Sequence, residues 1–255
     1  MSMLIIDQLQ VYRRGVAVLS ISHAELQAGE VIAVLGPNGA GKSSLLKAIS
    51  SQWLADSGSI HLHDKALQEW PRRERARHVG VLPQSSELSF PFRAQEVVAI
   101  GATPLSLDSS QIREQSLHWM QITDTLPFAD RIYTSLSGGE RQRVQLARIL
   151  LQLSSAEKPP LLLLDEPTSA QDLGQQHHLL QLIRQLSQQQ NTGVIMILHD
   201  LNQAIRYADK IWLLKEGKMI ASGAPETILQ PDRIEQTWGY CPELLSSKDG
   251  HQVLI

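Results

Sequence analysis

The feature that most constrains the fold of this chain is a glycine-rich segment between an apolar run and an amphipathic stretch. The apolar run Val31–Leu35 predicts a buried strand, and apolar residues at helical spacing after Lys42 predict a helix. The segment between them matches the P-loop pattern, Gly36-Pro37-Asn38-Gly39-Ala40-Gly41-Lys42-Ser43. A glycine-rich turn with a surface lysine is the alternative, but the preceding strand and following helix favour a phosphate-binding loop.

The residue types in this segment suit the phosphates of a nucleotide. Glycines let the backbone curl so that several N–H groups point inward at phosphate oxygens. The start of the following helix adds partial positive charge, and the ammonium of Lys42 can reach the outer phosphates. The hydroxyl of Ser43 suits Mg²⁺. We therefore expect a nucleotide and Mg²⁺ as cofactors. The candidate nucleotide-binding residues here are Gly36, Pro37, Asn38, Gly39, Ala40, Gly41, Lys42, Ser43 and Ser44.

Composition limits the class of protein. The chain has 255 residues, of which 42% are hydrophobic, so it can bury a core of ordinary size. The net charge of -3 gives no overall attraction for nucleic acid, and we expect no nucleic-acid partner. A single cysteine, Cys241, rules out an internal disulfide and fits a reducing compartment. The first residues do not resemble a signal peptide and the apolar runs are too short to cross a bilayer, so we expect a protein inside the cell.

Strand patterns and helical patterns alternate along the chain. The first 35 residues are rich in Val and Ile with polar interruptions, which predicts antiparallel strands. Short apolar runs at 161–164 and 194–198 predict strands buried on both faces, as in a parallel sheet. The runs at 211–214 and 219–221 flank a turn and predict a hairpin.

These patterns predict an α/β fold in one domain of residues 1–255. It has a P-loop NTPase core, an antiparallel β subdomain and a helical insertion over about 87–153. A short C-terminal tail follows at about 224–255. In the tail we expect a short helix and core packing by Trp238, Tyr240 and Cys241.

A second motif is an apolar strand that ends in two acidic residues, Leu161-Leu162-Leu163-Leu164-Asp165-Glu166. Taken alone, such acidic residues are often solvated surface groups. Phosphoryl transfer needs a metal-holding carboxylate at a strand end, and this segment follows a P-loop in the same chain. We therefore predict that Asp165 holds Mg²⁺ and that Glu166 polarises the attacking water as general base.

A third segment, Leu136-Ser137-Gly138-Gly139-Glu140-Arg141-Gln142, narrows the class of P-loop protein. Ser137 and Glu140 form the pattern of a capping box at a helix start, which is a purely structural alternative. A capping box does not explain Gly138 and Gly139, because glycine is unfavourable in a helix. Without side chains these glycines let a phosphate approach N–H groups at the helix N-terminus. The segment resembles the signature motif of the ABC-transporter ATPases.

The resemblance to this family extends from about residue 4 to residue 223 and implies further roles. Tyr12 is similar to the aromatic residue that stacks on adenine, with a core-packed strand aromatic as the alternative. Gln84 looks like the Q-loop glutamine, which contacts Mg²⁺ and senses the transport partner. His199 looks like the switch histidine that contacts the γ-phosphate. The resemblance therefore implies Glu166, His199 and Gln84 as catalytic residues, and Ser43, Gln84 and Asp165 as metal ligands.

The resemblance also implies a head-to-tail dimer. In this family each ATP lies between the P-loop of one subunit and the signature motif of a second copy. We therefore expect Ser137, Gly138, Gly139 and Glu140 to bind the nucleotide of the neighbour. Residues 169–172 resemble the D-loop, which adds Asp172 to the nucleotide-binding residues. Gln171 replaces the usual leucine there, so the resemblance does not imply its contacts.

The membrane partners implied by the resemblance are two permease subunits, with a periplasmic substrate-binding protein as an indirect partner. The protein would lie peripherally at the cytoplasmic face of the inner membrane. In residues 85–92, Phe90 and Phe92 are either core anchors of the insertion or the border of a groove for a permease helix. This stretch and the short chain resemble ATP-binding subunits of hemin importers. We expect hemin as cargo, with cobalamin or an iron-siderophore as the alternative.

Two other classes of protein compete with a transporter subunit, a non-transport ABC ATPase of DNA repair or translation and an ATP-dependent kinase with a P-loop. An ABC ATPase of DNA repair needs a long coiled-coil insertion, and the interval between Lys42 and Asp165 has no room for one. Translation members usually carry two motif sets in one chain, whereas this chain has one. A P-loop kinase would not need the glycines of the third segment. Within transporters, an export ATPase is the alternative.

Overall fold

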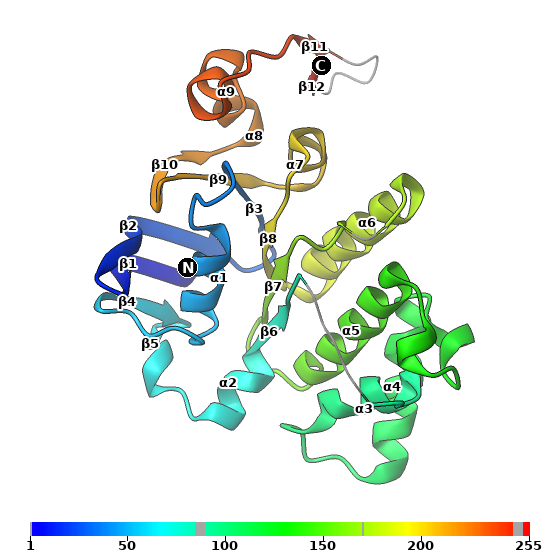
Figure 1. Cartoon of the computed structure of the whole chain (residues 1–255). Coiled ribbons are helices and arrows are strands. Elements are labelled where there is room, and N and C mark those ends of the chain that lie inside the picture. Colours follow the sequence, from blue (N-terminus) through cyan, green and yellow to red (C-terminus); the bar gives the residue numbers. More distant parts are fainter. Residues whose placement is uncertain (1, 85–89, 170, 247–251) are drawn as a thin grey trace.

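The computed structural model describes residues 2–84, 90–169, 171–246 and 252–255. Its strands are β1 (Ser2–Arg13), β2 (Val16–Gln27), β3 (Val31–Leu35), β4 (Ser57–Leu62), β5 (Lys65–Ala66), β6 (Val79–Leu82), β7 (Leu161–Asp165), β8 (Gly193–Ile197), β9 (Lys210–Lys215), β10 (Lys218–Gly223), β11 (Leu244–Ser246) and β12 (Gln252–Leu254). Ten of them form one sheet in the order β5-β4-β1-β2-β10-β9-β3-β8-β7-β6, and β11 pairs with β12 (Figure 1).

The centre of the sheet is parallel. Strands β9, β3, β8, β7 and β6 all run in one direction. Every residue of β3 and of β8 is buried, as expected for strands covered on both faces. The predicted parallel strands are thus confirmed, and the carboxyl ends of β3, β6, β7 and β8 lie at the same edge of the sheet.

The antiparallel part of the sheet is continuous with this core. β1 pairs with β2 and with β4, and β4 pairs with β5. β9 and β10 form the predicted hairpin. A parallel bridge between Lys218 and Ser20 joins β10 to β2. The predicted antiparallel strands are confirmed, and this bridge makes them part of the same sheet as the parallel strands.

Helices cover both faces of the parallel strands. The helices are α1 (Lys42–Ile49), α2 (Arg72–His78), α3 (Ala94–Ala99), α4 (Ser109–Ile122), α5 (Gly138–Leu153), α6 (Leu173–Gln190), α7 (Leu201–Tyr207), α8 (Pro225–Ile228) and α9 (Pro231–Trp238), with 3₁₀ turns η1 (Leu67–Glu69), η2 (Ile100–Ala102), η3 (Leu126–Phe128) and η4 (Tyr133–Ser135). Successive strand residues point to opposite faces. Ala33 therefore packs in the hydrophobic cluster of α5, α6 and α7, and Val34 packs in that of α1, β1 and β2.

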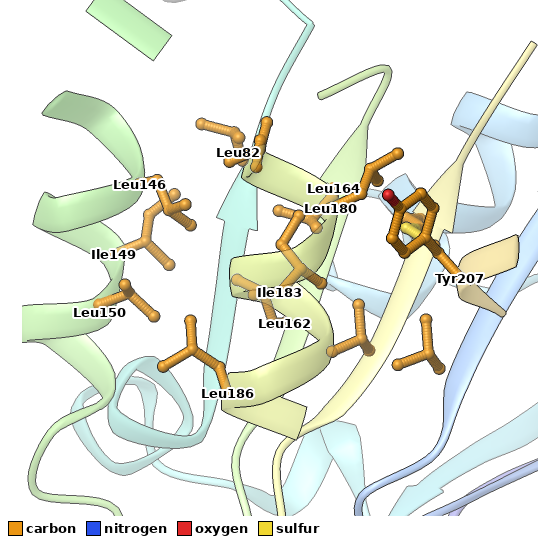
Figure 2. Close-up of a cluster of buried hydrophobic side chains, with 14 of the residues drawn as sticks. Leu82, Leu146, Ile149, Leu150, Leu162, Leu164, Leu180, Ile183, Leu186 and Tyr207 are labelled. Carbon is orange, nitrogen blue, oxygen red and sulfur yellow. The ribbon is translucent and has the colours of Figure 1, made fainter. Parts of the chain in front are cut away.

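The first of these clusters attaches α5 and α6 to the strands (Figure 2). In β7, Leu162 and Leu164 are fully buried beneath these helices. Apolar side chains from both helices and from β6 and α7 surround them, namely Leu82, Leu146, Ile149, Leu150, Leu180, Ile183, Leu186 and Tyr207. The cluster fixes α5 against the strand that carries Asp165 and Glu166.

The insertion predicted at about 87–153 is helical in its described part, from residue 90 onward. It contains α3, α4 and α5 with the turns η2, η3 and η4, whereas residues 85–89 lie outside the described part of the chain. Phe90 is 68% exposed and Phe92 is 40% exposed, so the core-anchor alternative for them is wrong. Within the described residues, no helix is long and apolar enough to cross a membrane.

The C-terminal tail carries α8, α9 and the β11–β12 pair. Trp238 packs against the core as expected. Tyr240 is 60% exposed and Cys241 is exposed, so the expectation that these two pack on the core is wrong. Both residues follow Gly239, whose φ of +74 ends α9, so they do not continue the helix that packs Trp238 on the core. The last strand instead contacts α7 through two hydrogen bonds between the side chain of Asn202 and the backbone of Leu254.

The contact between η2 and α5 yields a stability prediction. A Cβ added at Gly101 would lie 2.1 Å from the backbone oxygen of Arg148. We expect Gly101→Ala to lower the free energy of unfolding by about 1–3 kcal/mol, because backbone must shift to admit a methyl group. The matched control is Gly174→Ala in α6, where the nearest heavy atom to the new Cβ is Asp172 Oδ1 at 3.5 Å. This control should be neutral or stabilising by up to about 1 kcal/mol. Equal urea midpoints for the two variants would contradict the prediction.

Candidate nucleotide-binding and hydrolysis site

A cavity of about 530 Å³ opens over the P-loop at the carboxyl ends of the parallel strands. Its volume is within the usual range of small-molecule sites, about 300–1,000 Å³. The predicted residues Asn38, Gly39, Ala40, Gly41, Lys42, Ser43, Ser44 and Glu166 line it, together with Val16, Ala17, Val18, Glu216 and Gly217.

The P-loop backbone adopts conformations that favour glycine. Gly36 has φ of +149, and a Cβ there would lie 2.1 Å from the backbone oxygen of Leu214. Gly41 has φ of +98 and is the N-cap of α1, with no side-chain hydrogen bond at this cap. The first N–H groups of α1 are therefore not capped by the N-cap side chain. A helix start of this kind is suited to bind phosphate oxygens.

Lys42 lies inside the loop that carries it. Its side chain is 7% exposed. Its ammonium donates to the backbone oxygens of Gly36, at 2.7 Å, and of Pro37, at 3.0 Å. Burial lowers the pKa of Lys42, and the nearby carboxylates of Glu166 and Asp165 oppose this shift. Gly36 and Pro37 thus hold the lysine through their backbone oxygens and do not themselves line the cavity. The first P-loop residue in the cavity wall is Asn38.

Ser43 and Asp165 lie side by side from different elements. Ser43 lies at the start of α1, and Asp165 is the last residue of β7. The hydroxyl of Ser43 donates a hydrogen bond of 3.4 Å to Oδ1 of Asp165. Burial raises the pKa of Asp165, the hydrogen bond from Ser43 lowers it, and the charge of Glu166 raises it again. Hydroxyl and carboxylate oxygens are hard ligands of the kind that Mg²⁺ prefers. A bound cation would also stabilise the ionised form of Asp165 and so oppose the increase in its pKa. These two residues therefore fit a magnesium site.

The three predicted catalytic residues meet at the end of β7. Oε2 of Glu166 accepts a hydrogen bond of 2.6 Å from Nε2 of Gln84, which follows β6. Oε1 of Glu166 lies 2.5 Å from Nε2 of His199, which follows β8. The side chain of Glu166 is 17% exposed, and that of His199 is 52% exposed. Parallel pairing of the three strands thus gathers residues that are far apart in the sequence.

A glutamine pair connects the helix of the third motif to the same carboxylate residue. Gln142 in α5 donates through Nε2 to the backbone oxygen of Glu166 at 3.3 Å. Gln171 donates in turn to Oε1 of Gln142 at 3.1 Å. Neither a role of Gln142 nor any contact of Gln171 was predicted from the sequence. The only sequence signal was the departure of Gln171 from the leucine usual in the family.

The third motif and Asp172 do not join the cavity of their own chain. Ser137 Oγ accepts from the N–H of Glu140 at 3.3 Å, and Glu140 Oε2 accepts from the N–H of Ser137 at 2.7 Å. The capping box is therefore present, and its hydrogen bonds lower the pKa of Glu140. Asp172 caps α6 by accepting from the N–H of Gln175 at 2.9 Å. Figure 1 shows α5 on the far side of the parallel strands from α1.

Tyr12 lies at the end of β1 and is 44% exposed, so the core-packed alternative is wrong. Its N–H donates to Asp56 Oδ2 at 2.7 Å. Among the described residues, the wall of the cavity includes Val16 of β2 rather than Tyr12. It also includes Glu216 and Gly217 from the β9–β10 turn. These residues could not be predicted from the sequence, because only the strand order brings β2 and the β9–β10 turn beside the P-loop.

Sequence comparisons agree with the motifs. The family profile described as ABC transporter matches residues 19–169. A hemin import ATP-binding protein of Shewanella denitrificans is 46% identical over 253 residues, which are 99% of this chain and 100% of that protein. A protein of the same name from Vibrio cholerae is 48% identical over 215 residues, which are 84% of this chain and 83% of that protein.

Structural comparisons agree as well. An inward-facing ABC transporter of the metal-chelate type is similar with a TM-score of 0.82 at 27% identity, over 100% of this chain and 97% of that chain. A dimeric ATP-binding cassette in a post-hydrolysis state, bound to ADP and Pi, has a TM-score of 0.77 at 25% identity, over 88% of this chain and 99% of that chain. The motifs, the fold and these relatives confirm the resemblance, and the chain belongs to the ABC transporter family as an ATP-binding subunit.

Proposed function

We propose that this chain binds and hydrolyses ATP to drive the uptake of hemin through an ABC importer. The observation that carries the hydrolysis is the carboxylate of Glu166, which lies in the wall of the P-loop cavity and contacts Gln84 and His199. The choice of hemin is supported by relatives over the full length of the chain that are named hemin import ATP-binding proteins.

In the proposed reaction, the P-loop and the start of α1 hold the phosphates while Lys42 neutralises the outer ones. Mg²⁺, when bound by Ser43 and Asp165 with Gln84 nearby, would neutralise charge on the phosphate oxygens. Glu166 accepts a proton from water as the water oxygen bonds to the γ-phosphorus. The bond from that phosphorus to the bridging oxygen breaks, and ADP leaves. His199 contacts the carboxylate of Glu166 and, in this proposal, also contacts the γ-phosphate.

A second copy of the chain is the proposed source of the missing phosphate contacts. Ser137, Gly138, Gly139, Glu140 and Asp172 belong to the cavity of the neighbour in this proposal. The support is that none of these five described residues lines the P-loop cavity of their own chain. A two-fold pair completes both sites at once, so that ATP closes the dimer and hydrolysis releases it.

The proposed transporter contains two membrane-spanning permease subunits and receives cargo indirectly from a periplasmic binding protein. This subunit would lie at the cytoplasmic face of the inner membrane, as one domain of residues 1–255 with a helical subdomain over about 87–153. The exposed side chains of Phe90 and Phe92 support a permease contact at the start of that subdomain.

The cargo is tested by reconstituting the chain with its permease in liposomes and measuring ATP-dependent uptake of hemin, cobalamin and an iron-siderophore. We expect hemin to be taken up in preference to the other two. Preferential uptake of cobalamin or of the siderophore would show that hemin is not the cargo. ATP-dependent efflux would contradict the proposal that the transporter is an importer. ATP hydrolysis with transport of none of the three compounds in either direction would favour a non-transport ATPase.

We expect Glu166→Gln to keep ATP binding and to reduce hydrolysis by about 10² to 10⁴, the range for losing a general base. The amide keeps the size of the side chain but cannot take the proton from water. The variant should therefore accumulate an ATP-bound dimer, which is measured by size-exclusion chromatography with ATP. A turnover rate equal to that of the unmodified chain would reject Glu166 as the base.

A mixing experiment tests the head-to-tail arrangement. Ser137→Arg should spare ATP binding by the monomer and block hydrolysis, because the arginine fills the space next to the helix N-terminus. Lys42→Ala should lose ATP binding, because the phosphates lose their nearest cation. A heterodimer of the two variants has one composite site with both changes and one with neither. We expect the mixture to recover hydrolysis that neither variant has alone. Normal hydrolysis by the Ser137→Arg variant alone would contradict the head-to-tail dimer. The motif around Ser137 would then serve only as a helix cap.

A further inference from the structure

Four glutamines outside the nucleotide cavity form a hydrogen-bonded chain next to Glu166. They are Gln142 in α5, Gln171 before α6, Gln176 in α6 and Gln203 in α7. Within the described residues, none of the four lines the cavity over the P-loop. One end of the chain reaches the backbone of the residue proposed as general base, so these side chains can influence the reaction without contacting the nucleotide.

The backbone of Glu166 has a conformation that is uncommon for a residue with a side chain. Its φ of +52 lies in the left-handed region. Its carbonyl oxygen accepts from the N–H of Ser169 at 3.3 Å, from Oγ of Ser169 at 3.0 Å and from Nε2 of Gln142 at 3.3 Å. The bonds from Ser169 stay within one turn of the chain, whereas the bond from Gln142 connects this turn to α5. Loss of that bond would let the backbone relax, and the carboxylate would move with it.

The orientation of the Gln142 amide follows from its partners. A backbone oxygen can only accept, so Nε2 of Gln142 must face Glu166 and Oε1 must face away. Oε1 accepts at 3.1 Å from Nε2 of Gln171. Gln142 is 9% exposed, so this oxygen depends on a donor from the protein rather than on water. A donor at position 171 therefore keeps the amide of Gln142 turned toward Glu166.

The amide of Gln171 is in turn oriented by the atoms to which it donates. Its Nε2 lies 3.1 Å from Oε1 of Gln142 and 3.5 Å from the backbone oxygen of Pro167. Its Oε1 is buried and has no hydrogen-bond partner in the part of the chain that the structure describes. The reverse orientation would bring the amide oxygens of Gln171 and Gln142 together. An unpaired buried oxygen is unfavourable, so the contacts of Nε2 determine the orientation.

The other two glutamines hold the backbone from which Gln171 extends. Nε2 of Gln176 donates to the backbone oxygens of Gln171, at 3.0 Å, and of Thr168, at 3.2 Å. Nε2 of Gln203 donates to Oε1 of Gln176 at 2.7 Å, and Oε1 of Gln203 accepts from Oγ1 of Thr168 at 3.4 Å. The donor of Gln171 is thus held by side chains of α6 and α7, independently of α5.

We propose that Gln142 and Gln171 are positioning residues for ATP hydrolysis. Gln171 orients the amide of Gln142, and this amide holds the backbone of Glu166. The carboxylate of Glu166 thereby stays beside Gln84 and His199. The proposal rests on the proposed role of Glu166 as general base, and it is independent of the transported cargo.

The test measures kcat and KM for ATP in the full chain with methionine at either position. Methionine keeps the length of glutamine and has no amide. We expect Gln142→Met and Gln171→Met each to lower kcat by about tenfold, because small displacements of a catalytic group are costly in rate. KM and the equilibrium affinity for ATP should change by less than about twofold, because neither residue lines the cavity. The double variant should be no slower than Gln142→Met alone, since Gln171 acts through Gln142.

Gln152→Met is the matched control on the same helix. Nε2 of Gln152 donates to the backbone oxygens of Ala76, at 2.6 Å, and of Val79, at 3.1 Å. Val79 is the first residue of β6, which runs parallel to β7, so this contact lies at the opposite edge of the strands from Glu166. The control therefore removes the same kind of bond, from an amide of α5 to the backbone, away from the site. We expect its kcat to be unchanged, with any loss confined to the midpoint of thermal unfolding.

Several outcomes would overturn the positioning role. These are an unchanged kcat in both single variants, losses that multiply in the double variant, and an equal loss of kcat in Gln152→Met. If Gln142→Met does not fold, Gln171→Met carries the test, because it leaves Gln142 in place.

Glu166→Gln separates this proposal from the role of the base. Hydrolysis by Glu166→Gln at the rate of the unmodified chain would remove the base on which the positioning role rests. A slow Glu166→Gln together with full kcat in Gln142→Met and Gln171→Met would overturn the positioning role alone.

Discussion

The parallel pairing of β3, β8, β7 and β6 is the constraint on which the rest of the site depends. Because these strands run in one direction, whatever follows each of them lies at the same edge of the sheet. The P-loop follows β3, Gln84 follows β6 and His199 follows β8. Glu166 follows β7 between them. Apolar side chains cover both faces of these strands, so their register is fixed by burial and the side chains at the edge are fixed with it.

Much of this arrangement was predictable from the sequence, because short apolar runs that end in polar motifs have few alternatives. Val31–Leu35 was predicted with its correct limits, and the meeting of Glu166 with His199 follows from two such runs. Residues that depend on strand order were not predictable. Val16 and Glu216 reach the cavity only because β10 joins β2 to the parallel strands. The exposure of Tyr240 depends on the turn at Gly239, which no periodicity reveals.

Both the backbone and the side chain of Glu166 accept hydrogen bonds from other elements of the structure. Its φ of +52 is unusual for a residue with a side chain, and Gln142 donates to its carbonyl oxygen. Since Gln142 belongs to α5, the helix that starts at the third motif is joined directly to the residue that follows β7. A shift of α5 would thus move the backbone of Glu166, and with it the carboxylate, through the hydrogen bond from Gln142. Gln171 donates to the same glutamine side chain.

The capping box at the start of α5 has a consequence for hydrogen-bond direction. A serine hydroxyl can accept one hydrogen bond and donate another at the same time. In Ser137 the oxygen accepts from the N–H of Glu140, and the hydroxyl proton stays available for donation. The carboxylate of Glu140 is one acceptor for it, and this hydrogen bond helps to lower the pKa of Glu140. A phosphate at the helix start would therefore compete with Glu140 for the same proton. The cap and the proposed phosphate contact can therefore share one hydroxyl group, because the cap uses its oxygen and the phosphate would use its proton.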